Sequence, residues 1–310
     1  MTVEKEPTDE RNFIRDRRFC ARARDAFKHL LAHRWPGGSA RIVLPAYIGH
    51  SPLEGSGIMD PLTELGIPYS FYRVDERLDA DLSSLESELR QGEVFASLII
   101  HYFGSQQPEM SRARALCHGA GAMLIEDCCH CLDLSGRGIG EVGDYALFSI
   151  HKVLPCADGG ILQCNQGALD PGAPPADSCA SSLPIRLWCD AAFDEIAARR
   201  VRNYELLAAE IDEVQGVRLF WPSLPKGAAP LNLPVLIDEV DRFGVYKRMR
   251  ARGVGVVALY HTLVDAIEAE AFPTSHEISR KILNLPIHQD VESEDVGIIA
   301  GALKRAIAES

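Results

Sequence analysis

Short apolar runs alternate with helix-like segments through the first half of the chain. The runs are flanked by polar positions, which is typical of buried strands in a parallel sheet. These predicted strands cover 40–45, 68–74, 95–101, 122–125 and 145–150. Apolar residues at helical spacing predict helices over 11–33, 52–65, 82–89 and 110–119. This alternation predicts an α/β fold, with a mostly parallel sheet covered by helices on both faces.

The pattern changes after residue 165. Segment 166–182 is rich in Gly, Pro, Ala and Ser, which favours a loop or linker. A long helix is predicted next, over 191–214, and its arginines are expected on a solvated face. The remainder is predicted to form strands at 231–237 and 254–259 and helices at 242–252 and 293–308. We therefore expect a large α/β domain over 1–190, followed by a bridging helix and a small α+β domain over 191–310.

Composition excludes several classes of function. The chain has 310 residues and a formal net charge of -12 at pH 7. This acidic excess argues against a surface for nucleic acid or for an anionic membrane. No apolar run approaches the length of a transmembrane helix, and the first residues lack the apolar core of a secretory signal. We expect a cytoplasmic protein whose nine cysteines are mostly reduced thiols.

Polar groups follow the ends of several predicted strands. Asp127 follows the run 122–125, and Lys152 follows the run 145–150. Right-handed crossovers align parallel strand ends on one edge, where open α/β sheets bind ligands. That edge would gather Tyr47, His101, Asp127 and Lys152 into one cleft.

The Asp127 and Lys152 pair is what pyridoxal phosphate requires. A lysine amine forms a Schiff base with the aldehyde of this cofactor, and an aspartate keeps the pyridinium nitrogen protonated. Each residue also has a simpler interpretation, as a surface lysine and as a helix-capping aspartate. The occurrence of both, with Gly159-Gly160 downstream, favours the cofactor site.

The stretch from Ala122 to Cys164 resembles the core of the DegT/DnrJ/StrS family, fold-type-I aminotransferases that often act on nucleotide-linked keto-sugars. That family carries an E-D-x-x-[QH] element, a G-D-x-x-x-F-S segment, the lysine and a Gly-Gly turn. The matching positions are Glu126-Asp127 with His130, Gly143-Asp144 with Phe148-Ser149, Lys152 and Gly159-Gly160. The short Ser149–Lys152 spacing is similar to a divergent branch with S-x-x-K-x-L-P-x-x-D-G-G.

This resemblance implies a role for each matching residue. Lys152 would carry pyridoxal phosphate as the internal aldimine. Asp127 would hold the pyridinium nitrogen, His130 would touch the ring hydroxyl O3′, and Ser149 would bind the phosphate.

Two further segments resemble cofactor-binding elements of the family. The segment containing Ala23 and Arg24 is similar to one that opens the first long helix and holds the phosphate through backbone N–H groups. Tyr47 lies in an L-P-A-Y segment, and Tyr47 and His50 are candidates to stack on the pyridine ring. A turn residue without ring contact is the alternative for both.

Substrate contacts are expected at four positions. His101 precedes a turn similar to the family's H-x-x-G, and an orienting or packed role is favoured over that of a base. Tyr260 and His261 follow a predicted strand where the family meets substrate, with a polar loop pair as the alternative. The family's intersubunit N-Y-R element is missing, and Arg186 is a candidate replacement.

A cysteine-rich turn raises the question of zinc. Cys128, Cys129, His130 and Cys131 are consecutive, but adjacent cysteines do not easily chelate one tetrahedral ion. The chain also lacks the paired C-x-x-C motifs of a zinc site. We expect no metal and interpret these thiols as small groups that fill space behind the cofactor.

The main hypothesis is a pyridoxal-phosphate-dependent aminotransferase. It would move an amine from an amino acid, glutamate by family habit, to a keto-sugar or another small ketone, and family habit also implies a homodimer. Two alternatives stay open. One is a different outcome on the same cofactor, such as elimination, decarboxylation or C–C bond formation. The other is a non-catalytic relative.

Overall fold

Two β-sheets organise the chain. The computed structural model describes residues 16–132, 138–165, 167–225 and 227–310. The larger sheet has seven strands, in the order β1-β7-β6-β5-β4-β2-β3. They are β1 (Asp16–Cys20), β2 (Arg41–Pro45), β3 (Tyr69–Tyr72), β4 (Val94–Ile100), β5 (Met123–Asp127), β6 (Tyr145–Ser149) and β7 (Gly160–Cys164). Strands β3, β2, β4, β5 and β6 run parallel, whereas β7 and β1 pair antiparallel at one edge.

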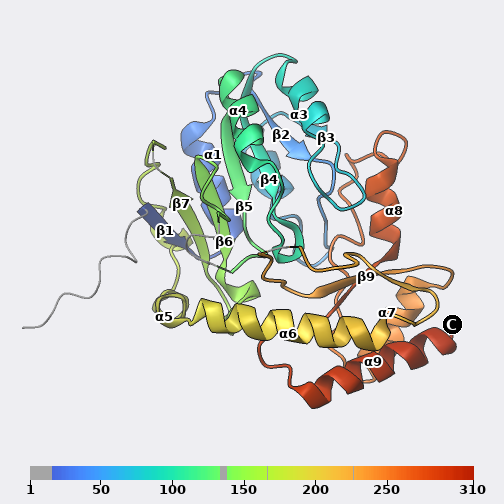
Figure 1. Ribbon diagram of the computed structural model, residues 1–310. Helices are drawn as coiled ribbons and strands as arrows, with labels where there is room; N and C mark the ends of the chain where they lie inside the picture. Colours follow the sequence, from blue (N-terminus) through green and yellow to red (C-terminus); the bar gives the residue numbers. More distant parts are fainter. Residues whose placement is uncertain (1–15, 133–137, 166, 226) are drawn as a thin grey trace, which may run out of the picture.

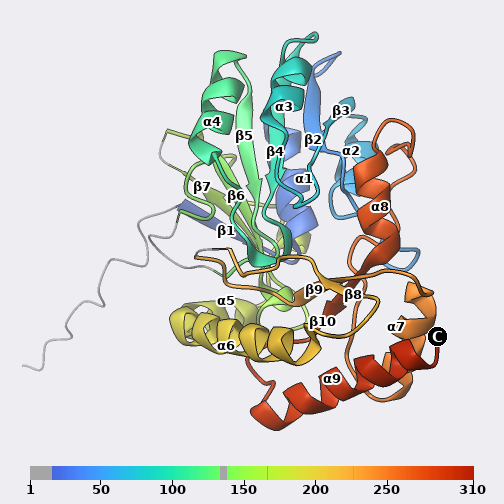
Figure 2. The ribbon, with the colours of Figure 1, turned by 45° about the vertical axis from the view of Figure 1, so that its right-hand side comes forward.

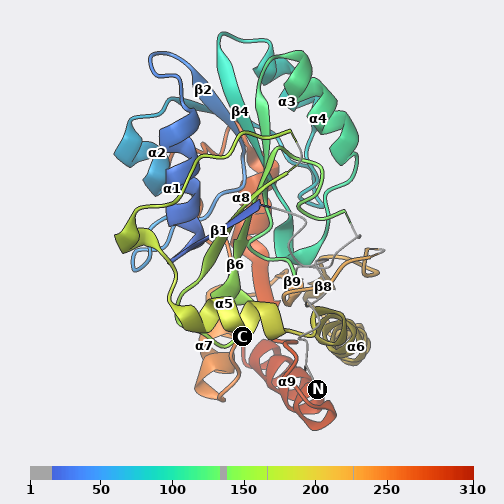
Figure 3. The same cartoon turned by 90° about the vertical axis from the view of Figure 1, so that its left-hand side faces the viewer.

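Burial on both faces explains the central strands. Every residue of β4 is buried, as expected for an apolar strand covered on two sides. Figure 3 shows α1 (Ala23–Arg34) and α2 (Met59–Leu65) on one face, and α3 (Leu82–Leu89) and α4 (Met110–Gly119) on the other. Helix α3 begins where the Asp81 carboxylate accepts hydrogen bonds from the amides of Ser83 and Ser84.

The smaller sheet has the antiparallel order β10-β9-β8. Its strands are β8 (Val217–Leu219), β9 (Leu233–Ile237) and β10 (Ile282–Leu285), and the remaining helices are α5 (Ser182–Asp190), α6 (Phe193–Ile211), α7 (Arg242–Ala251), α8 (Pro273–Lys281) and α9 (Ser293–Ala308). Figures 1 and 2 show α6 running below the carboxyl edge of the larger sheet, with α9 packed beside it. Helix α6 therefore lies at the edge where Asp127 and Ser149 end their strands.

The fold class expected from the sequence is confirmed. Helices α3, α4 and α9 have the predicted bounds, and each parallel strand lies within two residues of its predicted position. The proposed division into domains at residue 190 stays a prediction. No helix within the described residues is both long and apolar enough to span a bilayer.

The predicted helix over 11–33 is wrong in its first half. Residues 11–15 lie outside the described residues, and Asp16–Cys20 forms the edge strand β1 instead. This strand pairs along its length with β7, from Asp16 opposite Cys164 to Cys20 opposite Gly160. Tertiary pairing thus overrides the local helical pattern.

Three other expectations need correction. The helix predicted over 52–65 begins only at Met59, because residues 51–55 form a turn closed by a Ser51–Gly55 bridge. Segment 254–259 is not a strand but forms a single bridge, between Val257 and Asn284. Helices α5 and α8 were not predicted; α5 directly follows the segment expected to be a linker.

Candidate active site

Asp127 is the last residue of β5 and is 7% exposed. Its Oδ1 accepts a hydrogen bond of 2.9 Å from the Cys129 amide, which fixes the carboxylate at the carboxyl edge of the sheet. The neighbouring Cys129 thiol is buried, and this burial raises its pKa well above the ordinary value. The thiol is therefore neutral, and Asp127 supplies the negative charge at this point.

His130 lies in the turn after β5 and is buried. Its Nδ1 accepts a hydrogen bond from the Phe103 amide at 3.2 Å, so the ring proton is on Nε2. The Phe103 ring stacks on His130 with centroids 6.0 Å apart and planes 14° apart. Burial lowers the pKa of His130 well below its ordinary range, and the charge of Lys152 lowers it further. His130 is thus a neutral hydrogen-bond donor through Nε2.

Lys152 ends a short 3-10 helix (Ile150–Lys152) that follows directly from β6. Its side chain is exposed, and no group in the described parts of the chain accepts a hydrogen bond from its amine. Ser149, three residues earlier, is buried, with its Oγ 3.3 Å from Nδ1 of His151. The structure therefore provides a free amine near His130 and a hydroxyl at the same strand end.

The first turn of α1 packs closely on β7. Gly160 lies opposite both Ser149 and Cys20 in the sheet. A Cβ atom at Gly160 would lie 2.2 Å from the Ala23 nitrogen, so only glycine permits this approach. Ala23, the first residue of α1, therefore brings the N-terminus of a 12-residue helix to the strand end that carries Ser149. Such an N-terminus favours anions.

Aromatic rings gather beside His130. Tyr260 lies 5.7 Å from His130 and 5.2 Å from Tyr47, measured between ring centroids. The backbone φ of Tyr260 is 59°, which is strained for a bulky residue, and the Ser279 hydroxyl donates to its carbonyl at 2.8 Å. The buried Tyr47 hydroxyl has no partner within the described residues. Tyr47 and Tyr260 thus come together near His130.

Four other candidate residues are not joined to this group by any contact within the described chain. Arg24 instead pairs with Asp60 of α2 at 3.1 Å and donates to the Glu54 carbonyl at 2.6 Å. The other three residues are exposed: His50, Arg186 on α5 and His261. The Nδ1 atom of His261 lies 2.6 Å from the Ala258 carbonyl in the same loop.

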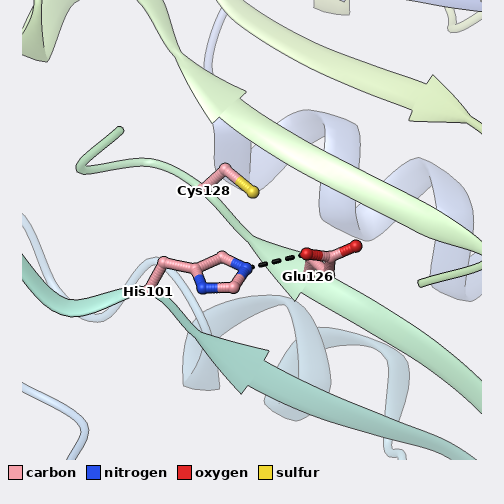
Figure 4. Close-up of side chains that lie close together, drawn as sticks. All are labelled: His101, Glu126 and Cys128. Carbon is pink, nitrogen blue, oxygen red and sulfur yellow. Dashed lines mark hydrogen bonds and ion pairs between the residues drawn. The ribbon is translucent and has the colours of Figure 1, made fainter. Parts of the chain in front are cut away.

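His101 points toward Glu126 and belongs to a buried hydrogen-bond network (Figure 4). Its Nδ1 accepts from the Gln107 amide, so Nε2 carries the proton that it donates to Glu126 at 2.8 Å. Glu126 also accepts from the amides of Gly140, Val142 and Gly143. His101 is fully buried with both ring nitrogens engaged, which leaves it no group for a substrate and corrects that expectation.

The same network bears on metal binding. Ligand atoms of His101, Glu126 and Cys128 lie within 4.8 Å of one another. Hydrogen bonds already use the histidine nitrogens and both carboxylate oxygens, and burial raises the pKa of Cys128 well above its ordinary value. A neutral thiol and a fully bonded carboxylate suit a structural role better than a metal site.

A cavity of about 280 Å³ lies between the two sheets and holds residues that the sequence did not indicate. Besides His130 and Lys152, it is lined by Arg200, Leu231, Asn232, Gly255, Val257, Leu259, Asn284, Leu285, Pro286 and His288. Arg200 of α6 is 1% exposed, contrary to the expected solvated face. Its spacing from the buried Ala197, Tyr204 and Leu207 was the available signal, because these positions share one face of the helix.

A strand-end carboxylate, a lysine after the next strand and a helix N-terminus at one edge of a mostly parallel sheet match the arrangement of fold-type-I pyridoxal-phosphate-dependent transferases. The model of the DegT/DnrJ/EryC1/StrS aminotransferase family matches residues 75–173 and 191–304, so the chain belongs to that family. It is therefore a pyridoxal-phosphate-dependent aminotransferase, and the resemblance found in the sequence is confirmed. No curated protein matches the chain.

Solved structures of aminotransferases share this fold. TlmJ from Streptoalloteichus hindustanus superposes with a TM-score of 0.75 at 21% identity, covering 94% of this chain and 86% of that one. PseC from Helicobacter pylori, involved in the biosynthesis of pseudoaminic acid, gives 0.79 at 14% identity over 95% and 87%. A 3-amino-5-hydroxybenzoic acid synthase gives 0.76 at 15% identity over 95% and 87%. At these identities the likeness establishes the fold.

Proposed function

We propose that this aminotransferase binds pyridoxal phosphate through Lys152 and moves an amine from an amino acid to a keto-sugar or another small ketone. The observation that carries the proposal is the arrangement at one sheet edge. Lys152 and the neutral donor His130 line one cavity there, and the Asp127 carboxylate ends the neighbouring strand β5, which supports the proposal. The family membership of the chain supports the same reaction class.

The residues present fit the cofactor. Asp127 would accept a hydrogen bond from the pyridinium N–H and so keep that nitrogen protonated, and Nε2 of the neutral His130 would donate to O3′. Ser149 and the amides that open α1 would hold the phosphate, because Gly160 lets the helix approach this strand end. The strained Tyr260 and the buried Tyr47 would cover the ring and exclude water. When bound, pyridoxal phosphate supplies an electron sink for the amino-acid Cα.

Lys152 would also move the proton that transamination requires. Its Nζ would first accept a proton from the substrate Cα and then deliver it to cofactor carbon C4′. The Nζ has no acceptor within the described residues, so it is available for both steps. Neutral His130, which lies near the Lys152 charge, would not compete for the proton.

The finer assignments also belong to this proposal. Glutamate would be the donor and a keto-sugar or small ketone the acceptor. A homodimer would form, and a partner subunit would cover the exposed Lys152. All nine cysteines are free thiols in the structure, which supports a reducing compartment such as the cytoplasm.

The first test is the absorbance spectrum of the purified chain with pyridoxal phosphate. Wild type should show the visible band of a lysine-bound cofactor, and borohydride should fix the cofactor covalently. Lys152→Ala should lose the covalent attachment. Lys28→Ala is the matched control, because Lys28 is exposed and pairs with Glu64 of α2. Absence of a band in wild type would refute the proposal.

A half-reaction with L-glutamate separates transamination from the other outcomes of this cofactor. Transamination should convert the visible band to the near-ultraviolet band of the amine form and release one 2-oxoglutarate per site. Elimination or decarboxylation would instead return the original spectrum after each turnover and give a different product. That second result would favour the alternative chemistry, which the shared fold with 3-amino-5-hydroxybenzoic acid synthase leaves open.

A further inference from the structure

A buried arginine, which forms no ion pair with any described residue, lines the cavity together with Lys152. Arg200 projects from α6 and is 1% exposed, and it is among the largest fully buried side chains. Other arginines on this helix behave differently. Arg199, one residue earlier, is exposed and pairs with Glu292 at 2.8 Å. Unlike Arg199, Arg200 makes no surface ion pair within the described chain, so its burial calls for a different explanation.

The contacts of Arg200 leave part of the guanidinium unused. Nε and Nη2 donate to Oε1 of Gln289 at 3.0 and 2.8 Å, and Nη2 also reaches the Val153 carbonyl at 3.2 Å. These acceptors are neutral, so they orient the side chain without balancing its charge. Nη1 is buried and has no partner in the described residues. An anion in the cavity that Arg200 lines would supply the acceptor that Nη1 lacks.

The electrostatic setting favours an anionic ligand. Burial lowers the pKa of Arg200 to about 10, and the nearest acidic influence is Asp290, whose side chain is 75% exposed. A buried cation is costly unless an anion pairs with it. No Asp or Glu is among the described residues that line the cavity, and Lys152 adds a second positive group. A bound anion would relieve both charges.

The remaining walls indicate what kind of anion fits. Leu231, Leu259 and Pro286 make much of the lining apolar. Asn232 also lines the cavity; its Oδ1 accepts from Asn284 at 3.1 Å, and its amide nitrogen has no acceptor in the described chain. The cavity of about 280 Å³ is at the small end of the range for ligand pockets. These features suit a small carboxylic acid with an aliphatic body.

We propose that Arg200 binds a carboxylate of the amino-acid donor through Nη1, on the small-sheet side of Lys152. This inference rests on the proposed aminotransferase function and names the substrate class that this part of the site recognises. Gln289 and Val153 are positioning groups that hold the guanidinium so that Nη1 faces the ligand. The donor carboxylate would thus pair with a buried guanidinium through a charge-assisted hydrogen bond from Nη1.

The test measures binding of glutarate, a dicarboxylate that lacks the amine and cannot react. Full-length protein loaded with pyridoxal phosphate is titrated with glutarate by calorimetry, and glutaramide serves as the uncharged analogue. Wild type should bind glutarate and not glutaramide. Arg200→Met should weaken glutarate binding at least about tenfold. Arg199→Gln is the matched control on the same helix and should change the affinity less than about twofold.

A second variant guards against misfolding of Arg200→Met. Gln289→Glu places a carboxylate at hydrogen-bond distance from Arg200 with almost no change in shape. It should keep the melting temperature and still weaken glutarate binding about tenfold, because the internal carboxylate balances the charge. Unchanged glutarate affinity in both variants, or no binding by wild type, would overturn the inference. If the lysine-bound absorbance is present in these same samples, the proposed function survives that failure.

Discussion

Glu126 and Asp127 are adjacent carboxylates on one strand, yet their surroundings differ completely. Successive side chains of a strand point to opposite faces. Glu126 is fully buried and accepts four hydrogen bonds, from His101 and three backbone amides. Asp127 accepts one backbone hydrogen bond within the described chain, from Cys129, and lies at the edge that carries Lys152.

The number of hydrogen bonds that each carboxylate accepts distinguishes the structural network around Glu126 from the reactive site around Asp127. Burial alone would raise the pKa of Glu126, but the hydrogen bonds from His101, Gly143 and Val142 lower it, so this carboxylate stays charged. Every polar atom of that network has a partner. At the carboxyl edge of the sheet and in the adjoining cavity, the Lys152 amine, Nη1 of Arg200 and the Tyr47 hydroxyl have none among the described residues. Arg200 and Lys152 line one cavity, so partnerless groups of these two residues are candidates for contact with a ligand there.

The largest effect is expected at the reactive carboxylate. Asp127→Asn keeps the oxygen that accepts from the Cys129 amide, so the free energy of unfolding should change by less than about 1 kcal/mol. The amide cannot hold a protonated pyridinium, so kcat for transamination should fall at least about 100-fold. Steady-state kinetics with saturating cofactor and urea unfolding measure the two quantities. A stable variant with unchanged kcat would contradict the role of Asp127.

The same chemical change at the neighbouring position should do the opposite. Glu126→Gln places an amide group against two of the four donors, so we expect a loss of about 2–4 kcal/mol in the free energy of unfolding. Urea unfolding of the two variants, measured side by side, tests this contrast. Where enough of the Glu126→Gln protein stays folded, its kcat should remain within a few fold of wild type. Equal stability of the two variants would remove the distinction between the two networks.

Protonation of His130 on unfolding should have a smaller effect, on the pH dependence of the free energy of unfolding. The folded chain keeps this ring neutral because burial lowers its pKa well below 6.5, whereas the unfolded chain takes up a proton near pH 6.5. Wild type should therefore lose stability relative to His130→Gln as pH falls below 6.5, by up to about 1.4 kcal/mol per pH unit. Urea unfolding of both proteins at pH 7.5 and 5.5 measures this. If wild type and His130→Gln differ in free energy of unfolding by the same amount at pH 7.5 and at pH 5.5, the pKa of His130 is not lowered by folding.

The sequence predicted the parallel part of the fold because its signals are local. Helix α3 has an Asp81 cap, and the central strands are short apolar runs between polar segments. The edge strand β1 was missed because only its pairing with β7 distinguishes it from a helix. Local pattern therefore located the sheet that carries the site but not the strand that closes its edge.

The candidate site divides in a similar way. Asp127 and Lys152 follow strand ends, so topology alone predicts that they share an edge. Arg200 lies far along the chain on a helix with several arginines, and its burial depends on packing against the Gln289 loop. No local signal identifies that loop as its partner. The positions of Asp127 and Lys152 were therefore predictable from strand ends, although His101 also follows a strand end and points into the Glu126 network instead. The contact between Arg200 and the Gln289 loop joins distant segments and was not predictable.

The smallest effect is expected at Arg24. It tests whether a side chain that already has partners within the protein takes no part in cofactor binding. The sequence suggested that it contributes to phosphate binding, but its guanidinium pairs with Asp60 and the Glu54 carbonyl. Arg24→Gln should change the dissociation constant for pyridoxal phosphate less than about twofold and stability by less than about 1 kcal/mol, because the ion pair is partly exposed. Fluorescence titration of the apoprotein measures the constant. A tenfold loss of affinity would mean that Arg24 leaves Asp60 for the phosphate, and that a fully partnered side chain can still belong to the reactive face.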